Sequence, residues 1–171
     1  MTPQLETIKL LLLDVDGVLT RGQVIYSDSG EQIKSFHARD GLGLRLLMDS
    51  GIQAGIITGR TSRALFHRCD NLGIDLVLDN IKEKGKGLKT MSDRTGIPFD
   101  QIAFVGDDLI DLSAMNLAGL AITVPDAPRE VKERAAIVTT ARGGEGAVRE
   151  VCEEILKAQG MWQKAIQHFL Q

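Results

Sequence analysis

Short apolar segments alternate with amphipathic segments along most of this chain, and this alternation limits the folds that it can adopt. The most pronounced apolar segment, IKLLLLD at residues 8–14, predicts a strand buried on both faces. Further strands are predicted at 53–59, 75–79, 102–108 and 120–124, and helices at 41–51, 62–73, 86–96, 111–119 and 128–135. Strands that alternate with helices form βαβ units. We therefore predict an α/β fold with a doubly wound, Rossmann-like parallel sheet covered by helices.

The length of the chain favours one domain. It has 171 residues, of which 43% are hydrophobic, and this is enough to bury a single core. We predict one domain over residues 1–171, with a helical tail at 143–171. Around Val151 the tail has an apolar helical face that predicts packing on the domain itself. The face around Trp162 leaves open whether it packs there or on a neighbouring subunit.

Residues 22–37, GQVIYSDSGEQIKSFH, interrupt the alternation. Two strand-like pieces flank the turn-rich stretch SDSG, and no helix separates them from the strand before, which predicts a β-hairpin. An isolated hairpin is marginally stable in water, so another surface is expected to pair with it or pack on it. The sequence leaves open whether this hairpin is a surface flap or a contact between subunits.

Composition argues against several classes of function. A net charge of −3, a pI near 5.6 and seven aromatic residues provide no basic or stacking surface for nucleic acid. The longest strictly apolar run, LLLL, is far shorter than the ~20 residues of a membrane span, and no signal-peptide pattern is seen. Cys69 and Cys152 suit buried positions in a reducing cytoplasm rather than a disulfide or zinc site. We predict a cytoplasmic protein that binds neither nucleic acid nor membranes.

Polar side chains occur where several predicted strands end. Ligands bind at the carboxyl ends of the strands in open α/β sheets, so these side chains are expected to converge. They are Asp14, Asp16, Thr58, Lys84, Asp107, Asp108 and Asp111. Two like charges 4 Å apart repel by about 4 kcal/mol at an effective dielectric of about 20. A crevice with several acids therefore requires a cation, and oxygen ligands favour Mg²⁺ together with the phosphate of a substrate.

These residues belong to four ordered motifs. DVDGVLT at 14–20, ITGR at 57–60, a downstream lysine and GDDLIDL at 106–112 resemble the motifs of the haloacid dehalogenase (HAD) superfamily of phosphatases. Over residues 8–160 the chain further resembles the 3-deoxy-D-manno-octulosonate 8-phosphate (Kdo 8-phosphate) phosphatases. The resemblance implies a HAD-like fold with a hairpin flap and no cap domain. It also implies a homotetramer with hairpins and tails at the subunit contacts.

The resemblance assigns chemical roles to the acids. Asp14 would attack phosphorus and form an aspartyl-phosphate, and Asp16 would serve as general acid and then as general base. Asp14, the backbone carbonyl of Asp16 and Asp107 would hold Mg²⁺. Asp111 would support these ligands from outside the metal's own coordination. Asp108 has two open interpretations, a similar supporting role or an acid favoured by a helix N-terminus.

The remaining site residues would bind the phosphoryl group and the sugar. Thr58 and Lys84 would hold the phosphoryl oxygens. Lys82 and Lys86 compete with Lys84, which we prefer because the pair Glu83-Lys84 resembles the third motif. The turn residue Gly59 precedes Arg60, whose planar guanidinium suits the carboxylate of a sugar acid.

Two positions bear on the choice of substrate. Related phosphatases of nine-carbon keto sugar acids tend to carry an acid where Arg60 stands, which favours Kdo 8-phosphate. In the tail the family often has a basic residue between the glycines of GGxG, where this chain has Glu145. Whether Arg142 replaces that basic residue stays open.

The sequence thus predicts a Mg²⁺-dependent phosphatase that hydrolyses Kdo 8-phosphate in the synthesis of lipopolysaccharide precursors. The alternatives are a phosphatase for another sugar acid phosphate, such as a nine-carbon keto sugar acid 9-phosphate, and a non-catalytic binding or scaffold module on the same fold. Release of phosphate separates the last alternative from the other two.

Overall fold

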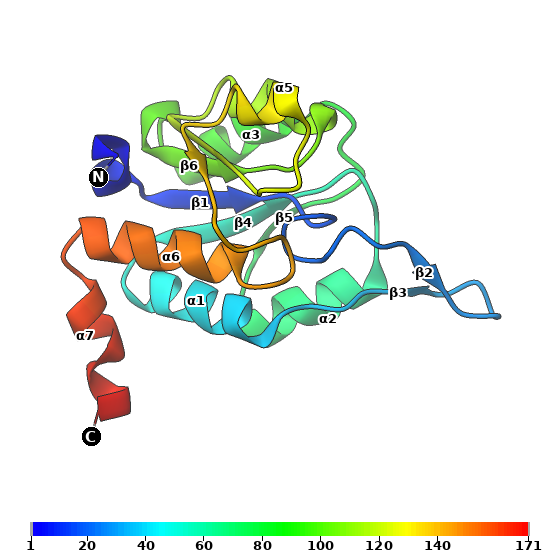
Figure 1. Ribbon diagram of the computed structural model, residues 1–171, viewed down its shortest axis with the longest axis horizontal. Helices are drawn as coiled ribbons and strands as arrows, with labels where there is room; N and C mark the ends of the chain where they lie inside the picture. The colour runs from blue at the N-terminus through cyan, green and yellow to red at the C-terminus, as the bar shows by residue number, and fades with distance from the viewer. Residues whose placement is uncertain (1, 171) are drawn as a thin grey trace.

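The computed structural model describes residues 2–170, apart from the side chain of His168, and within them places six strands in one sheet (Figure 1). They are β1 (Leu10–Leu13), β4 (Gln53–Ile57), β5 (Leu76–Leu78), β6 (Ile102–Val105), β7 (Leu120–Thr123) and β8 (Ile137–Val138). Their order is β5-β4-β1-β6-β7-β8, and all neighbours are parallel. This is the order of a doubly wound sheet, so the predicted fold class is confirmed.

The central strand, β1, is buried on both faces. Successive side chains of a strand point to opposite faces. Leu11 and Leu13 accordingly pack into one hydrophobic core, and Leu10 and Leu12 pack into the other. A strand covered on both sides has no polar face, which explains the unbroken run of leucines.

Helices cover the two faces of the sheet (Figure 1). On one face lie α1 (Ala38–Asp49), α2 (Arg63–Leu72) and α6 (Ala147–Ala158). On the other lie α3 (Lys84–Thr95), α4 (Leu112–Met115) and α5 (Arg129–Lys132). The two cores are therefore separated by the sheet, and the loops that follow the strands meet at one edge.

Three segments differ from their predictions. The helix predicted at 111–119 is a 3-10 turn, η3 (Leu109–Asp111), followed by the short α4, because Asp111 turns back onto backbone N–H groups of its own loop. The helix predicted at 128–135 ends at Lys132, because the chain must return to the sheet, where the backbone N–H of Ala136 donates to Ala121. The strand β8, which follows, was not predicted, because its two residues are too few to show the alternating pattern of a strand.

The chain also contains 3-10 helices outside the sheet layers. They are η1 (Pro3–Thr7), η2 (Phe99–Gln101) and η4 (Gln167–Leu170).

The interrupting segment forms a hairpin. β2 (Ile25–Tyr26) pairs antiparallel with β3 (Gln32–Ile33) in a two-stranded sheet of their own. The hairpin projects beyond the end toward which β1 points (Figure 1). Between β1 and α1 the chain carries this hairpin and no larger insertion. The end of the sheet that bears the predicted site is therefore covered by little of this chain.

The tail packs against the body. Val151 and Ile155 of α6 are buried against α1, as predicted. The helix α7 (Trp162–Ile166) follows, and the Trp162 ring lies against the same core with Arg149 and Lys157 near it, at 5.5 and 5.4 Å from its centre. The Trp162 side of this face therefore packs on the chain itself, and a further contact of the tail with a neighbouring subunit stays a prediction. None of the described helices has both the length and the apolar composition needed to cross a membrane.

Candidate active site

Asp14 and Asp107 meet where the strand order reverses. They follow β1 and β6, which are neighbours in register, with Leu13 opposite Val105. The backbone N–H of Asp14 donates to the Val105 carbonyl at 3.0 Å and extends this pairing by one residue. Crevices at such reversal points bind ligands in doubly wound sheets. Two acids from distant parts of the sequence are thus held side by side by the main chain.

A pocket of about 220 Å³ opens above these two acids. The predicted residues among those that line it are Asp14, Asp16, Thr58, Gly59, Arg60, Asp107 and Asp108. Lys84 and Asp111 do not line it, but they are buried next to Asp14 and contact one another. All the site residues expected from the sequence therefore lie in one region.

Lys84 is the buried lysine of the third motif. It is the first residue of α3, and its ammonium lies 2.7 Å from Asp14 Oδ1 and 2.5 Å from Asp111 Oδ1. Burial alone would lower the pKa of Lys84, but the charges of the two aspartates outweigh it and hold the pKa above its usual value. Lys82 and Lys86 are exposed, and Lys86 pairs with Glu83 at the surface. Of the three candidates, only Lys84 contacts the acids of the pocket.

Asp111 and Asp108 shape the loop after β6. Asp111 Oδ1 accepts from Lys84, and Oδ2 accepts from the backbone N–H groups of Asp107 and Asp108 at 3.0 and 3.1 Å. The exposed Asp108 accepts from the backbone N–H of Leu109 at 2.7 Å. Both oxygens of Asp111 are thus engaged, which supports a role outside a metal's own coordination. Asp108 caps the following 3-10 turn.

Asp14, Asp107 and Asp111 share one neighbouring cation, Lys84, so their negative charges are only partly compensated. Carboxylate oxygens of Asp14, Asp107 and Asp111 lie within 4.8 Å of one another. Burial raises the pKa of Asp14 to about 6 against the opposing charge of Lys84. Burial, together with the charges of Asp14 and Asp111, raises the pKa of Asp107 to about 8. Asp107 Oδ1 is buried and has no hydrogen-bond partner in the part of the chain that the structure describes. Such a cluster suits a divalent cation with oxygen ligands.

Glycines allow the backbone to approach this cluster closely. Gly17 has φ +92°, and a Cβ there would overlap the Asp107 carboxylate. A Cβ at Gly143 would overlap the carbonyl of Gly17 in turn, and the Gly144 N–H donates to the Val18 carbonyl at 2.9 Å. The glycines of the tail therefore hold the loop of the first motif in place.

The second motif is fixed by its main chain. The Thr58 N–H donates to the Leu78 carbonyl, and the Thr58 carbonyl accepts from Ile81, both at 2.9 Å. The Thr58 hydroxyl accepts from the Arg60 N–H at 3.3 Å. The exposed Arg60 side chain lines the pocket, and it forms no ion pair with any described residue. It is available to an acidic group outside the chain.

Arg142 does not reach the pocket in place of the basic residue missing from the tail. Arg142 lies 3.5 Å from Asp126, and Glu145 lies 3.1 Å from Arg21. Neither Arg142 nor Glu145 lines the pocket.

Sequence reasoning missed four neighbours of the predicted residues, one of which, Gly22, is part of the pocket's lining. Lys34, at the base of the hairpin, forms an ion pair with Asp16. The exposed side chains of Val24 and Ile110 form an apolar part of the pocket's rim. Ile110 lies inside the fourth motif, but the motif does not show that its side chain reaches the rim, and Lys34 and Val24 reach the site through the path of the hairpin.

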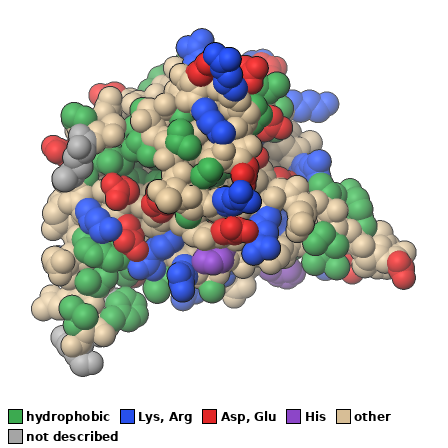
Figure 2. Space-filling view, viewed as in Figure 1, with side chains coloured by type: hydrophobic (Ala, Val, Ile, Leu, Met, Phe, Trp, Pro, Cys, Tyr) green, Lys and Arg blue, Asp and Glu red, His purple; other side chains and the backbone are tan. Residues whose placement is uncertain are grey.

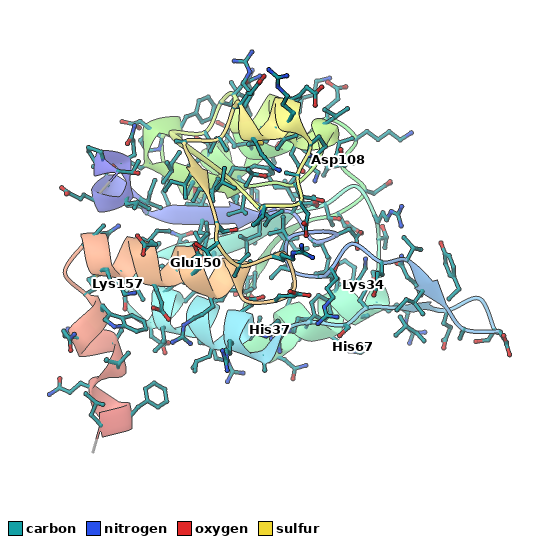
Figure 3. The ribbon with its side chains drawn as sticks, in the orientation of Figure 1. Lys34, His37, His67, Asp108, Glu150 and Lys157 are labelled. Atoms are coloured by element: carbon teal, nitrogen blue, oxygen red, sulfur yellow. The ribbon has the colours of Figure 1, made fainter. Side chains whose placement is uncertain are left out.

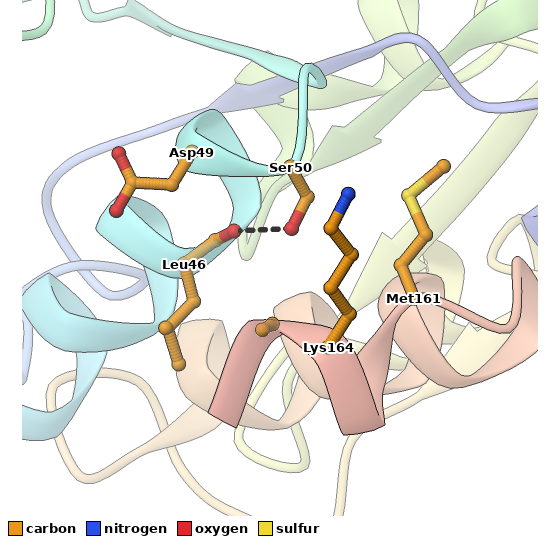
Figure 4. Close-up of a pocket in the computed structure, with 6 residues that line it drawn as sticks. Leu46, Asp49, Ser50, Met161 and Lys164 are labelled. Atoms are coloured by element: carbon orange, nitrogen blue, oxygen red, sulfur yellow. Dashed lines mark hydrogen bonds between the residues drawn. The ribbon is translucent and has the colours of Figure 1, made fainter. Parts of the chain in front are cut away.

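A second hollow carries none of these groups. It has a volume of about 330 Å³ and lies between α1 and α7 (Figure 4). Leu46, Ser50, Met161 and Lys164 are among its lining residues, and the Ser50 hydroxyl donates to the Leu46 carbonyl at 2.8 Å. It is larger than the acidic pocket, but it gathers no cluster of acids. We therefore place the candidate active site at the carboxyl edge of the sheet.

Comparison with known proteins shows the family to which the chain belongs. A haloacid dehalogenase-like hydrolase family matches residues 77–151. The 3-deoxy-D-manno-octulosonate 8-phosphate phosphatase of Haemophilus influenzae is 44% identical over 160 residues, which cover 94% of this chain and 89% of that protein. This chain belongs to the Kdo 8-phosphate phosphatase family. The family member of Escherichia coli K12 is 42% identical over 94% of this chain and 85% of its own length.

Solved structures of the family superpose closely. A Kdo 8-phosphate phosphatase from Moraxella catarrhalis, in complex with magnesium, phosphate and KDO, has a TM-score of 0.95 at 42% identity and covers 97% of this chain and 95% of that one. The cobalt-bound form of the Haemophilus influenzae phosphatase has a TM-score of 0.93 at 43% identity, with coverage of 98% and 99%. The predicted family resemblance is confirmed.

Proposed function

We propose that this chain is a Mg²⁺-dependent phosphatase that hydrolyses Kdo 8-phosphate to Kdo and inorganic phosphate. The observation that carries the proposal is the pairing of buried Asp14 with half-buried Asp107 beside Lys84, under a pocket at the carboxyl edge of the sheet. Relatives that are 42–44% identical bear the name of this activity. We infer that this reaction belongs to the synthesis of lipopolysaccharide precursors.

The acids of the pocket fit a magnesium ion. Asp14, the backbone carbonyl of Asp16 and Asp107 would hold it. The fit rests on the unpartnered, buried Oδ1 of Asp107 and on the raised pKa of that carboxyl, which records a repulsion that a cation relieves. When bound, the ion neutralises negative charge on the phosphoryl oxygens.

Asp14 is the nucleophile. A bond forms between its carboxylate oxygen and phosphorus while the bond between phosphorus and the sugar oxygen breaks, which leaves an aspartyl-phosphate. Lys84 holds Asp14 Oδ1 at 2.7 Å, so the attacking group is oriented before substrate arrives. Thr58 and Lys84 supply donors for the phosphoryl oxygens, and their fixed positions avoid reorganisation during the transfer.

Asp16 moves the proton. Its protonated carboxyl gives a proton to the sugar oxygen as that oxygen leaves phosphorus. The resulting carboxylate then takes a proton from the water that attacks the aspartyl-phosphate. This second step releases phosphate, regenerates Asp14 and returns Asp16 to its protonated form. Asp16 lines the pocket and follows Asp14 by two residues, whereas Asp108 is occupied as a cap.

Arg60 selects the sugar acid. Its guanidinium lies at the rim of the pocket and offers a planar pair of donors to a carboxylate. Arg60→Glu should raise KM for Kdo 8-phosphate by roughly tenfold with little change in kcat, since one charged hydrogen-bonded contact is lost. A preference of the wild type for a nine-carbon keto sugar acid 9-phosphate would favour the alternative substrate.

Phosphate release tests the activity. The purified protein is incubated with Kdo 8-phosphate, with the nine-carbon ester and with a generic phosphate ester, each with Mg²⁺ or with EDTA. We expect release from Kdo 8-phosphate that EDTA abolishes and added Mg²⁺ restores. Release that is indifferent to EDTA would contradict the metal assignment. No release from any ester would favour the non-catalytic alternative.

We infer in addition that the chain forms a homotetramer in the cytoplasm. Hydrophobic side chains gather on the projecting hairpin (Figure 2), where Val24, Ile25, Tyr26 and Ile33 are exposed. Exposed apolar groups on a hairpin too small to be stable by itself favour burial against other subunits. Closed symmetry would limit such an assembly to a defined number of chains. Light scattering should report about four chains, and cell fractionation tests the compartment.

A further inference from the structure

Lys34 is the residue of the hairpin that reaches the candidate active site. It directly follows β3 and lies where the hairpin joins the body (Figure 3). Its ammonium forms an ion pair with Asp16 Oδ1, and only 3% of its side chain is exposed. The preceding residue, Ile33, is 50% exposed. The exposed hairpin therefore ends in a buried cation that faces the site.

The burial of this lysine calls for a partner of opposite charge. Lysine is seldom buried without one, because its ammonium is strongly hydrated in water. Among the described residues, Asp16 is the acid that pairs with Lys34. Asp14 and Asp111 share the other buried lysine, Lys84. Lys34 thus compensates the charge of Asp16, and Lys84 compensates the two acids deeper in the crevice.

The ion pair divides the two oxygens of Asp16. Oδ1 accepts from Lys34, while the side chain as a whole lines the pocket. No hydrogen bond from the described residues engages Oδ2. One oxygen is therefore anchored, and the other is available to carry a proton to and from the reacting oxygen. Such anchoring limits rotation of the carboxyl group, and proton transfer depends on its placement within hydrogen-bond reach.

We propose that Lys34 is a positioning residue that anchors Asp16 for proton transfer and so couples the position of the hairpin to catalysis. The proposal rests on the proposed function of Asp16. Lys34 stands one residue after β3, so a contact that fixes the hairpin also fixes the backbone from which the ammonium reaches Asp16. It acts through Asp16 and does not itself touch the reacting atoms.

The test compares two leaving groups in Lys34→Met. Sugar alkoxide must be protonated as it leaves, whereas p-nitrophenolate departs as a stable anion and needs no proton. The ratio kcat/KM reports the steps up to departure of the leaving group. We expect kcat/KM to fall roughly 10- to 100-fold for Kdo 8-phosphate, within the range of general acid catalysis. For p-nitrophenyl phosphate it should change by less than about threefold.

Two further variants separate positioning from general damage. Lys34→Arg retains a cation and should restore at least part of the activity on Kdo 8-phosphate. In an Asp16→Asn background, Lys34→Met should cause no further loss on that substrate, because residues that act as a unit are not additive. Lys89→Met, at an exposed position on α3, is the control and should match the wild type on both esters.

Each outcome decides the proposal. An equal loss on both esters, or an additive loss in the Asp16→Asn background, would show a merely structural role and overturn it. A Lys34→Met enzyme as active as the wild type would also overturn it. If the wild type hydrolyses p-nitrophenyl phosphate but not Kdo 8-phosphate, the proposed substrate fails. The same comparison is then made with a sugar phosphate that the wild type does hydrolyse.

Discussion

The acidic crevice at the carboxyl edge of the sheet and the projecting hairpin differ in how far their side chains are buried. In the crevice, Asp14, Lys84 and Asp111 are buried and held by hydrogen bonds and ion pairs within one chain. In the hairpin, two-residue strands carry apolar side chains into solvent, and Tyr26 is 65% exposed. The ion pairs and hydrogen bonds of the crevice thus form within one chain, whereas the hairpin leaves apolar side chains exposed.

This difference separates two parts of the proposed activity. The groups assigned to phosphoryl transfer sit on loops fixed by a rigid sheet, so one chain positions them. Exclusion of water and recognition of the sugar need a cover over the pocket, and this chain places only a hairpin there. Variants in the crevice should therefore affect chemistry and stability. Variants in the hairpin should affect assembly and the sugar substrate.

The largest expected effect is on turnover in Asp14→Asn. Loss of the nucleophile should lower kcat by at least about 10⁴-fold, because no other group can form the covalent intermediate. The fold should survive, since the change removes one charge from a crowded acidic cluster. Steady-state kinetics and circular dichroism measure the two effects. Asp93→Asn, on the exposed face of α3, is the matched control. Turnover retained by Asp14→Asn would contradict the mechanism.

Lys84→Met should lose both activity and stability. Removing one partner of a buried ion pair costs about 3–5 kcal/mol in the free energy of unfolding, because the remaining charges stay buried without compensation. Denaturant unfolding of the metal-free protein measures this loss. Lys86→Met removes an exposed pair with Glu83 and should change stability by less than about 1 kcal/mol. Equal effects of the two variants would show that Lys84 does not stabilise the crevice.

Changes in the hairpin should lower assembly and activity but leave the stability of the isolated chain nearly unchanged. Tyr26→Asp combined with Ile33→Asp places charges on its exposed apolar surface. We expect loss of the tetramer in light scattering and a roughly 10- to 100-fold loss of kcat/KM on Kdo 8-phosphate. The free energy of unfolding of the isolated chain should stay within about 1 kcal/mol, because neither side chain is buried in it. A monomer with full activity would reduce the hairpin to a surface flap.

The smallest expected effect is the change in thermal stability of the metal-free protein with pH. The pKa values of Asp14 and Asp107 rise on folding from the usual 3.8 to about 6 and about 8. The folded state therefore binds these protons more tightly, and the resulting stability, complete below pH ~4, is lost as pH rises through 6 and 8. With EDTA, Tm should fall by a few degrees between pH 5.5 and 8.5. Asp107→Asn should flatten this decline, whereas the hairpin variant should keep it. An unchanged slope in Asp107→Asn would contradict the origin assigned to the effect.

The chain's pattern was enough to predict the sheet and the region of the site. The run Leu10–Leu13 has no polar face, so it must be a strand covered on both sides, and helical segments alternate with the strands after it. Since the carboxyl ends of parallel strands share one edge, the polar residues that follow them were expected to converge there. The positions of Asp14, Thr58 and Asp107 around one pocket agree with that rule.

Only the tertiary structure decided which distant side chains meet. Lys84 reaches Asp111 across 27 residues, and Lys34 reaches Asp16 across 18. The exposed Lys86 stands two residues from Lys84, and nothing in their spacing separates a buried cation from a surface one. Hydrophobic periodicity records which face of an element is covered. The approach of one side chain to another depends on loop paths and backbone clearance, such as the space that Gly17 leaves for Asp107. These exist only once the chain has folded.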